Sequence, residues 1–187
     1  TVKYNSAGDT IWTRRVNKGT VEQACGVAVD GAGNIIVTGL SHNGSNNDYY
    51  TVKYDPNGNV LWTDSVDRGD QDEAYGVAVD KEGNIIVVGR SYSSTSNYDF
   101  YIIKYTTTGD TSWTRVLDKG GEDGAYGVVT DTNNNIIVTG YATFGTQDFY
   151  IVKYDPNGNI LWTDSIDNGD VDYAFGVAVD SENDIIV

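Results

Sequence analysis

Short apolar runs separated by turn residues follow one another along the whole chain. In one complete unit they lie at 74–80, 85–89, 99–105 and 111–117, and we call the strands that they predict A, B, C and D. Strand B, with Ile85-Ile86-Val87, is apolar on consecutive residues, whereas a strand with one face in water alternates. We therefore expect both faces of strand B to be covered.

The segments between strands A and B, and between C and D, contain the residues of tight turns. The sequence D-P-N-G-N at 55–59 places proline where a type I turn needs a fixed φ, and glycine where a bulged hairpin needs a positive φ. Gly33 and Gly83 keep this plan in two A–B turns, and Asn134 and Asn183 replace the glycine in the next two. Each unit is therefore predicted to contain two antiparallel hairpins.

The same pattern recurs at a nearly constant step. The four tryptophans are 50, 51 and 49 residues apart, at Trp12, Trp62, Trp113 and Trp162. A fixed period of this size indicates an array of one small unit. We divide the single domain, 1–187, into units at 1–23 (partial), 24–73, 74–124, 125–173 and 174–187 (partial).

The character of the four strands predicts an all-β fold. Glycines such as Gly76 mark a crowded strand A, strand B is buried, and Thr63-Asp64-Ser65 makes strand D polar, as in an outer edge strand. Sheets of this kind describe the four-stranded antiparallel blades of a β-propeller.

We expect the two ends of the chain to share a blade. Residues 1–4 begin in a strand C and residues 185–187 end in a strand B. Pairing the N-terminal strands C and D with the C-terminal strands A and B would close a ring of four blades. The alternatives are that the chain is half of a larger ring, or that two chains combine.

The composition narrows the partners. The 27 acidic and 12 basic side chains give a net charge of −15, which argues against nucleic acid and against anionic lipid surfaces. No apolar run is long enough for membrane insertion. The chain has no methionine and starts in mid-pattern, so we expect it to be processed or part of a larger polypeptide or assembly.

Two segments carry a family resemblance. V-A-V-D-x-x-G-N-I-I-V-T-G at 27–39, followed by D-Y-Y-T-V-K-Y-D-P-N-G-N-V-L-W at 48–62, resembles the SBBP-type β-propeller repeats of bacterial and archaeal secreted and cell-surface proteins. The resemblance recurs in every unit and implies a secreted or cell-surface location. It implies more blades than this chain holds, and it supplies no catalytic residues.

The B–C and D–A loops differ between units and share one end of the predicted blades, so we expect a ligand there. The B–C loops at 41–47, 91–98 and 142–147 combine aromatic and small polar residues, as binding loops do; the alternative is ordinary surface loops. The candidate ligand-binding residues are Tyr92, Tyr98, Phe144, His42, Asn46 and Gln147.

The D–A loops carry clusters of acids that could hold calcium, which takes six to eight oxygen ligands. The candidate ligands are Asp67, Asp70, Asp72, Asp118, Glu122, Asp123, Asp167, Asp170 and Asp172. Their spacing differs from the twelve-residue calcium loop, and the alternative is that they cap backbone N–H groups in turns. Calcium is thus a candidate, and no cofactor is required.

A lysine recurs on strand C between apolar neighbours, at Lys3, Lys53, Lys104 and Lys153. A buried ammonium needs a partner, and we expect a carboxylate from strand D or from a neighbouring blade.

No catalytic constellation stands out, so we expect a non-enzymatic extracellular scaffold or interaction module with a protein or glycan partner on the B–C/D–A face. The alternative is a lectin-like, carbohydrate-binding propeller. A third hypothesis is a hydrolase or lyase that uses paired acids on the same face.

Overall fold

The computed structural model describes residues 1–92 and 97–187, and their regular structure consists of β-strands. Three four-stranded sheets form three blades. The first blade contains β3 (Glu22–Val29), β4 (Ile35–His42), β5 (Asn47–Tyr54) and β6 (Val60–Val66). The second contains β7 (Asp72–Val79), β8 (Ile85–Tyr92), β9 (Tyr98–Tyr105) and β10 (Thr111–Leu117). The third contains β11 (Gly124–Thr130), β12 (Ile136–Thr143), β13 (Gln147–Tyr154) and β14 (Ile160–Ile166).

Within each blade the strands follow the predicted order A-B-C-D, and every neighbouring pair is antiparallel. Strands A and B are longer than predicted, because their ladder continues from Ala74 to the pair formed by Asp72 and Ser91. Asp72 is consequently a strand residue rather than a loop residue. Residues 93–96, part of one predicted B–C loop, lie outside the described residues.

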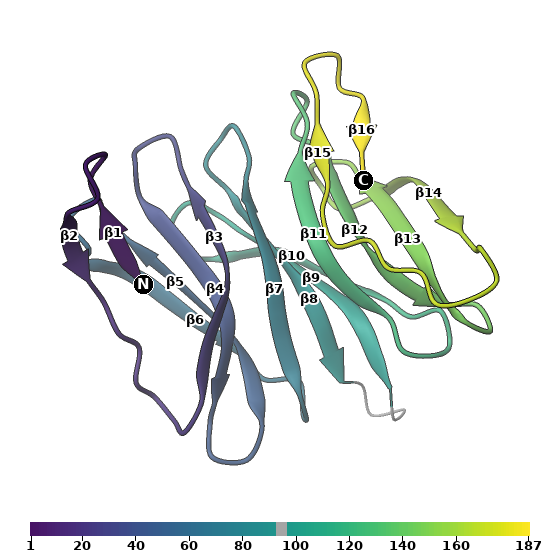
Figure 1. The fold of residues 1–187 in the computed structure, drawn as a ribbon, viewed down its shortest axis with the longest axis horizontal. Coiled ribbons are helices and arrows are strands. Elements are labelled where there is room, and N and C mark those ends of the chain that lie inside the picture. The colour runs from purple at the N-terminus through teal and green to yellow at the C-terminus, as the bar shows by residue number, and fades with distance from the viewer. Residues whose placement is uncertain (93–96) are drawn as a thin grey trace.

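The predicted turns are confirmed by their backbone angles. Gly83 and Gly58 have φ of 83° and 82°, and Asn134 and Asn183, which replace glycine, have φ of 61° and 67°. All the A–B and C–D turns lie at one end of the blades, and the described parts of the B–C and D–A loops lie at the other (Figure 1).

The blades stack on one another through their apolar faces. Ile85 and Val87 face the core shared with the first blade, whereas Ile86 and Val88 face the core shared with the third. This arrangement explains why strand B is apolar on consecutive residues. Strand A lies close to the next blade, because a Cβ on Gly76 would sit 2.8 Å from the backbone oxygen of Tyr126.

The two ends of the row carry half-blades. β1 (Val2–Tyr4) pairs with β2 (Thr10–Thr13), and β15 (Ala178–Val179) pairs with β16 (Ile185–Ile186), as separate two-stranded sheets. They lie at opposite ends of the row (Figure 1), so the sheets here form an open array. Among the described residues there is no helix of the length and apolarity needed to cross a membrane.

Candidate functional site

The strand C lysines hold the blades together. Lys53, Lys104 and Lys153 lie 2.9, 3.0 and 2.8 Å from a carboxylate oxygen of Asp30, Asp80 and Asp131, respectively. The expected pairing with a carboxylate is thus confirmed for these three lysines, whereas no salt bridge joins Lys3 to a described residue, and the expected source of the acid was wrong. The acid comes from the A–B turn of the same blade, because strands A and C flank strand B and their turns share one end.

Lys53 and Lys104 also reach the next blade. Lys104 donates a hydrogen bond to the carbonyl oxygen of Pro156 at 3.2 Å, and Trp113 donates to the same oxygen at 3.1 Å. Lys3 and Trp12 repeat these contacts on Pro56. This end of the blades therefore stabilises the stack.

At the opposite end, three predicted ligand-binding residues have local partners. Asn46 is buried, and its amide donates to the carbonyl oxygens of Gly69 and Asp70, which ties a B–C loop to a D–A loop. His42 accepts a hydrogen bond from the backbone of Gly44. Phe144 is exposed and contacts the ring of Tyr150.

The other three lie beside one group of rings. Tyr92 packs edge-on against Tyr98, with centroids 5.2 Å apart, and the guanidinium of Arg90 lies 4.0 Å from the Tyr98 centroid. Gln147 accepts a hydrogen bond from the hydroxyl of Tyr173 and donates one to Glu122.

Sequence reasoning missed an aromatic cluster that runs from the second blade across the third to the segment that follows β14. Its members, which lie near the B–C/D–A end, are Tyr75, Tyr126, Tyr141, Tyr173 and Phe175. The ring centroid of Tyr126 lies 5.1 Å from that of Tyr75 and 5.0 Å from that of Phe175. Tyr75, Tyr126 and Phe175 occupy one repeated position before the strand A glycine, and this recurrence is a signal that could have revealed the cluster.

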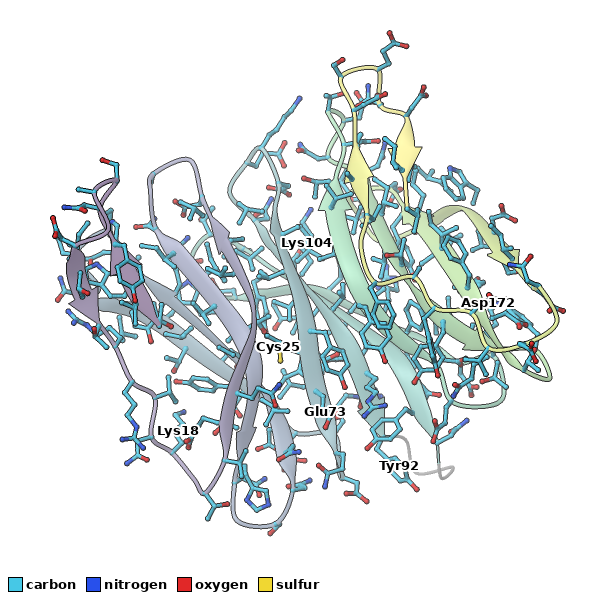
Figure 2. All side chains as sticks on the ribbon, viewed as in Figure 1. Lys18, Cys25, Glu73, Tyr92, Lys104 and Asp172 are labelled. Atoms are coloured by element: carbon cyan, nitrogen blue, oxygen red, sulfur yellow. The ribbon has the colours of Figure 1, made fainter. Side chains whose placement is uncertain are left out.

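An ion pair borders the aromatic cluster. Arg90 donates from Nε to Glu73 at 2.9 Å, and the hydroxyl of Tyr75 donates to the same oxygen. Figure 2 shows Glu73, Tyr92 and Lys18 in the lower half of the molecule. Burial raises the pKa of Tyr141 to about 12, so its hydroxyl stays protonated at neutral pH. The surface thus offers aromatic faces, hydroxyl donors and a paired carboxylate and guanidinium.

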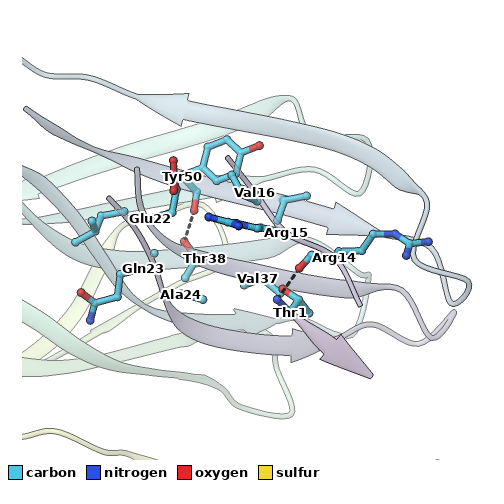
Figure 3. Close-up of a pocket in the computed structure, with 13 residues that line it drawn as sticks. Thr1, Arg14, Arg15, Val16, Glu22, Gln23, Ala24, Val37, Thr38 and Tyr50 are labelled. Atoms are coloured by element: carbon cyan, nitrogen blue, oxygen red, sulfur yellow. Dashed lines mark hydrogen bonds between the residues drawn. The ribbon is translucent and has the colours of Figure 1, made fainter. Parts of the chain in front are cut away.

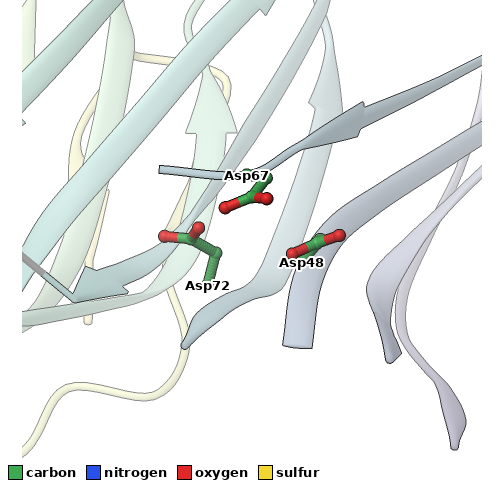
Figure 4. A group of neighbouring side chains, drawn as sticks. All are labelled: Asp48, Asp67 and Asp72. Carbon is green, nitrogen blue, oxygen red and sulfur yellow. The ribbon is translucent and has the colours of Figure 1, made fainter. Parts of the chain in front are cut away.

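The acidic residues are only partly gathered. Asp67 and Asp72 meet Asp48, which sequence reasoning missed, and one oxygen from each lies within 4.8 Å of the others (Figure 4). Asp118 and Asp123 meet Asp99, also missed, in the same way. Asp48 and Asp99 come from the start of strand C and are distant in sequence from the D–A loops.

The remaining predicted acids lie outside these two groups. Asp70 and Asp170 are exposed, Glu122 binds Gln147, Asp167 accepts from Gly169 N, and Asp172 accepts from Asn168 N. The turn-capping alternative therefore describes Asp167 and Asp172. The corresponding acids of the first two blades, Asp67, Asp72, Asp118 and Asp123, accept the same backbone hydrogen bonds.

Burial raises the pKa of three of these acids, Asp48, Asp72 and Asp123. Burial is the largest cause for Asp123, whose pKa rises to about 6, and the charges of Asp99 and Asp118 add to it. Its two oxygens accept hydrogen bonds from Lys119 N and Thr143 N, and its side chain is fully buried. A carboxyl enclosed in this way suits a structural or metal-binding role better than proton transfer to a substrate.

One cavity lies beside the first blade, next to the D–A segment between β2 and β3. It has a volume of 260 Å³, and Thr1, Arg15, Val16, Val37, Leu40 and Tyr50 are among the residues that line it (Figure 3). It lies on the face of the first blade that carries Val37 and Val52, which in that core contact Trp12.

Comparisons with known proteins agree with this fold. The family described as "Domain of unknown function (DUF5122) beta-propeller" matches residues 33–60 and 132–160. A protein of unknown function from Bacteroides caccae has a similar crystal structure, with a TM-score of 0.61 and 17% sequence identity. The match covers 96% of this chain and 57% of that one. No curated protein matches the sequence. The chain is therefore built of β-propeller repeats.

Proposed function

We propose that this chain is a non-enzymatic interaction module of SBBP-type repeats that belongs to a secreted or cell-surface protein. The observation that carries the proposal is the aromatic cluster with its Arg90–Glu73 pair. Tyrosine and arginine are the side chains that most often dominate binding energy at interfaces. In the open array, Tyr173 and Phe175, which lead into the C-terminal half-blade, are 40% and 69% exposed, so the cluster there presents a surface to a partner.

A protein partner is the first candidate, and the test is loss of capture. The immobilised chain is compared with Tyr126→Ala and with Leu61→Ala, in which an exposed apolar side chain outside the aromatic cluster is shortened. We expect a secreted or surface protein from the source cells to be retained by the parent and Leu61→Ala chains and lost from Tyr126→Ala. Equal retention by all three would contradict the proposal.

A glycan is the second candidate, favoured by flat rings beside a carboxylate and a guanidinium. Such a site combines apolar contact with a few placed polar groups. A glycan array probed with the parent chain, Tyr126→Ala and Glu73→Gln tests it. Binding that both substitutions abolish supports a lectin-like module, and a blank array removes this candidate.

We also propose that the two half-blades join into a fourth blade. Three vacancies, which are positions that lack a contact found in the complete blades, support this. Each complete blade pairs its strand C lysine with an A–B turn aspartate, whereas no salt bridge joins Lys3 or Asp180 to any described residue. Lys3 instead donates a hydrogen bond to Pro56 O, and Asp180 accepts from two backbone N–H groups of its own turn. In the register of the first blade, Ile186 would lie opposite Lys3.

The tryptophans give the second vacancy. Trp12, Trp62 and Trp113 each lie against the turn glycine of the next blade, so that a Cβ there would be 2.8 to 3.0 Å from the ring. Gly8 has no such neighbour, and Trp162 is 40% exposed. Trp162 would thus fit the turn at Gly8.

The cavity beside the first blade gives the third. Ile36 and Ile86 fill the core that each shares with the following blade, whereas the equivalent Ile186 is 54% exposed. Strand B of a joined blade would bring Ile186 to the face of the first blade, where the 260 Å³ cavity lies.

A double-mutant cycle tests this closure. We expect Lys3→Met and Asp180→Asn to be coupled, because joined half-blades place them in one ion pair. Additive effects would contradict closure. Sedimentation separates the alternatives: a coupled monomer supports the four-bladed ring, whereas a coupled dimer means that a second chain supplies the half-blade.

A further inference from the structure

We propose that calcium binds between the blades at two equivalent sites, each built from three aspartates. The first site contains Asp48, Asp67 and Asp72, and the second contains Asp99, Asp118 and Asp123. In each site two of the three side chains are buried and the middle one is exposed. The recurrence of one arrangement in two blades indicates a built feature.

Each site joins two blades. Asp48 is the second residue of β5, Asp67 follows β6, and Asp72 opens β7 of the next blade. A cation held by these three side chains would connect strands C and D of one blade to strand A of the next. The lysines and tryptophans connect the blades at the opposite end, so this end would gain a clamp of its own.

An unpaired oxygen points to a missing ligand in the first site. Asp72 is 1% exposed, and its Oδ2 accepts a hydrogen bond from Arg68 N at 2.7 Å. Its Oδ1 is buried and has no hydrogen-bond partner among the described residues. Figure 4 shows the carboxylates of Asp48, Asp67 and Asp72 around a common space. A buried carboxylate oxygen without a partner is costly, and a cation in that space would satisfy it.

The hydrogen bonds that Asp48, Asp67 and Asp72 accept come from neutral N–H groups. Asp48 accepts from the amide of Asn43, and Asp67 accepts from Gly69 N, both neutral donors. The guanidinium of Arg68 donates to Ser91 and lies 4.7 Å from the centroid of Tyr101.

The donor set favours calcium over other divalent ions. Carboxylate oxygens from a loop and two strands suit a hard cation with a flexible coordination shell, whereas magnesium demands near-ideal octahedral geometry and keeps its waters. The described groups contain neither histidine nor cysteine, which zinc and copper prefer. The exposed middle aspartate leaves a side for water to complete the shell.

The third blade carries aspartates at the same positions without the same grouping. Asp148 is buried, whereas Asp167 is exposed. Asp172 lies in a described segment that forms no strand. We therefore expect two calcium ions per chain.

Calorimetric titration of the purified chain with calcium chloride, after treatment with a chelator, tests the proposal. We expect two ions per chain for the parent, one for Asp67→Asn, and two for Asp70→Asn. Asp70 lies in the same loop, carries the same charge and is outside the site, so Asp70→Asn controls for net charge. Asp67→Asn keeps an oxygen that can accept from Gly69 N, and its circular dichroism should match the parent.

Thermal unfolding gives a second readout. Calcium at a hundredfold excess over its dissociation constant should raise Tm by about 5 to 10 °C for one site. No heat and no Tm shift at millimolar calcium would overturn the proposal. Equal losses in Asp67→Asn and Asp70→Asn, or an equal shift with magnesium, would also overturn it.

Discussion

Replacing Lys104 by methionine tests whether buried ion pairs hold the blades. The ammonium lies 3.0 Å from Asp80, and the side chains are 5% and 0% exposed. Removing one partner of such a pair typically costs about 3 to 5 kcal/mol, because the other charge stays buried. Asp80 keeps hydrogen bonds from Glu82 N, Asn84 N and the Asn84 amide, so we expect the lower end, about 3 kcal/mol.

Urea unfolding followed by circular dichroism measures this loss. A chain of this size loses about 2 to 4 °C in Tm per kcal/mol, so Tm should fall by about 6 to 12 °C. Lys119→Met is the control, because Lys119 is exposed and should cost less than about 1 kcal/mol. The double variant Lys104→Met/Asp80→Asn should recover part of the stability. A Lys104→Met chain as stable as the control, or a double variant with additive losses, would refute the reasoning.

Two further predictions concern the turns. Burial raises the pKa of Asp131, but the hydrogen bonds from Lys153 and from its own turn together lower it by more. The pKa of Asp131 therefore lies below the ordinary 3.8. Its stabilisation is therefore present above that pH and lost as pH falls through the folded-state pKa, and Asp131→Asn should show a flatter acid limb in ΔG of unfolding against pH. Gly58→Ala should cost more than Gly120→Ala in urea unfolding: both carry the penalty of about 1 to 2 kcal/mol for positive φ, but only Gly58 lies against Trp12. Equal losses would show that the tryptophan moves aside freely.

The sequence predicts the blades well because their causes are local. D-P-N-G-N fixes a hairpin by backbone geometry alone, and the apolar pairs of strand B require cover on both faces whatever the topology. The ends of strands A and B were predicted less accurately, because the pairing of Asp72 with Ser91 depends on which residues lie opposite each other, not on their hydrophobicity.

The sites were harder to predict because their members come from distant strands. Asp48 and Asp67 are 19 residues apart in the sequence, and only the antiparallel return of strand D brings them together. The lysine partners were misplaced for a similar reason. Strand D pairs directly with strand C, yet the acid comes from a turn that reaches over the buried strand between strands A and C.

Positions that repeat in each blade stabilise the joints between blades, whereas positions that differ between blades form the candidate binding surface. Lysine, turn aspartate, tryptophan and turn glycine recur at each joint, so one joint resembles the next. The pair Glu73–Arg90 does not recur: the first blade has Gln23 opposite Leu40, and the third has Gly124 opposite Tyr141. Cys25 occupies the position of Tyr75 in the first blade and is exposed. Although the joints repeat, a partner that recognises rings together with this ion pair therefore meets that surface once, between the second and third blades.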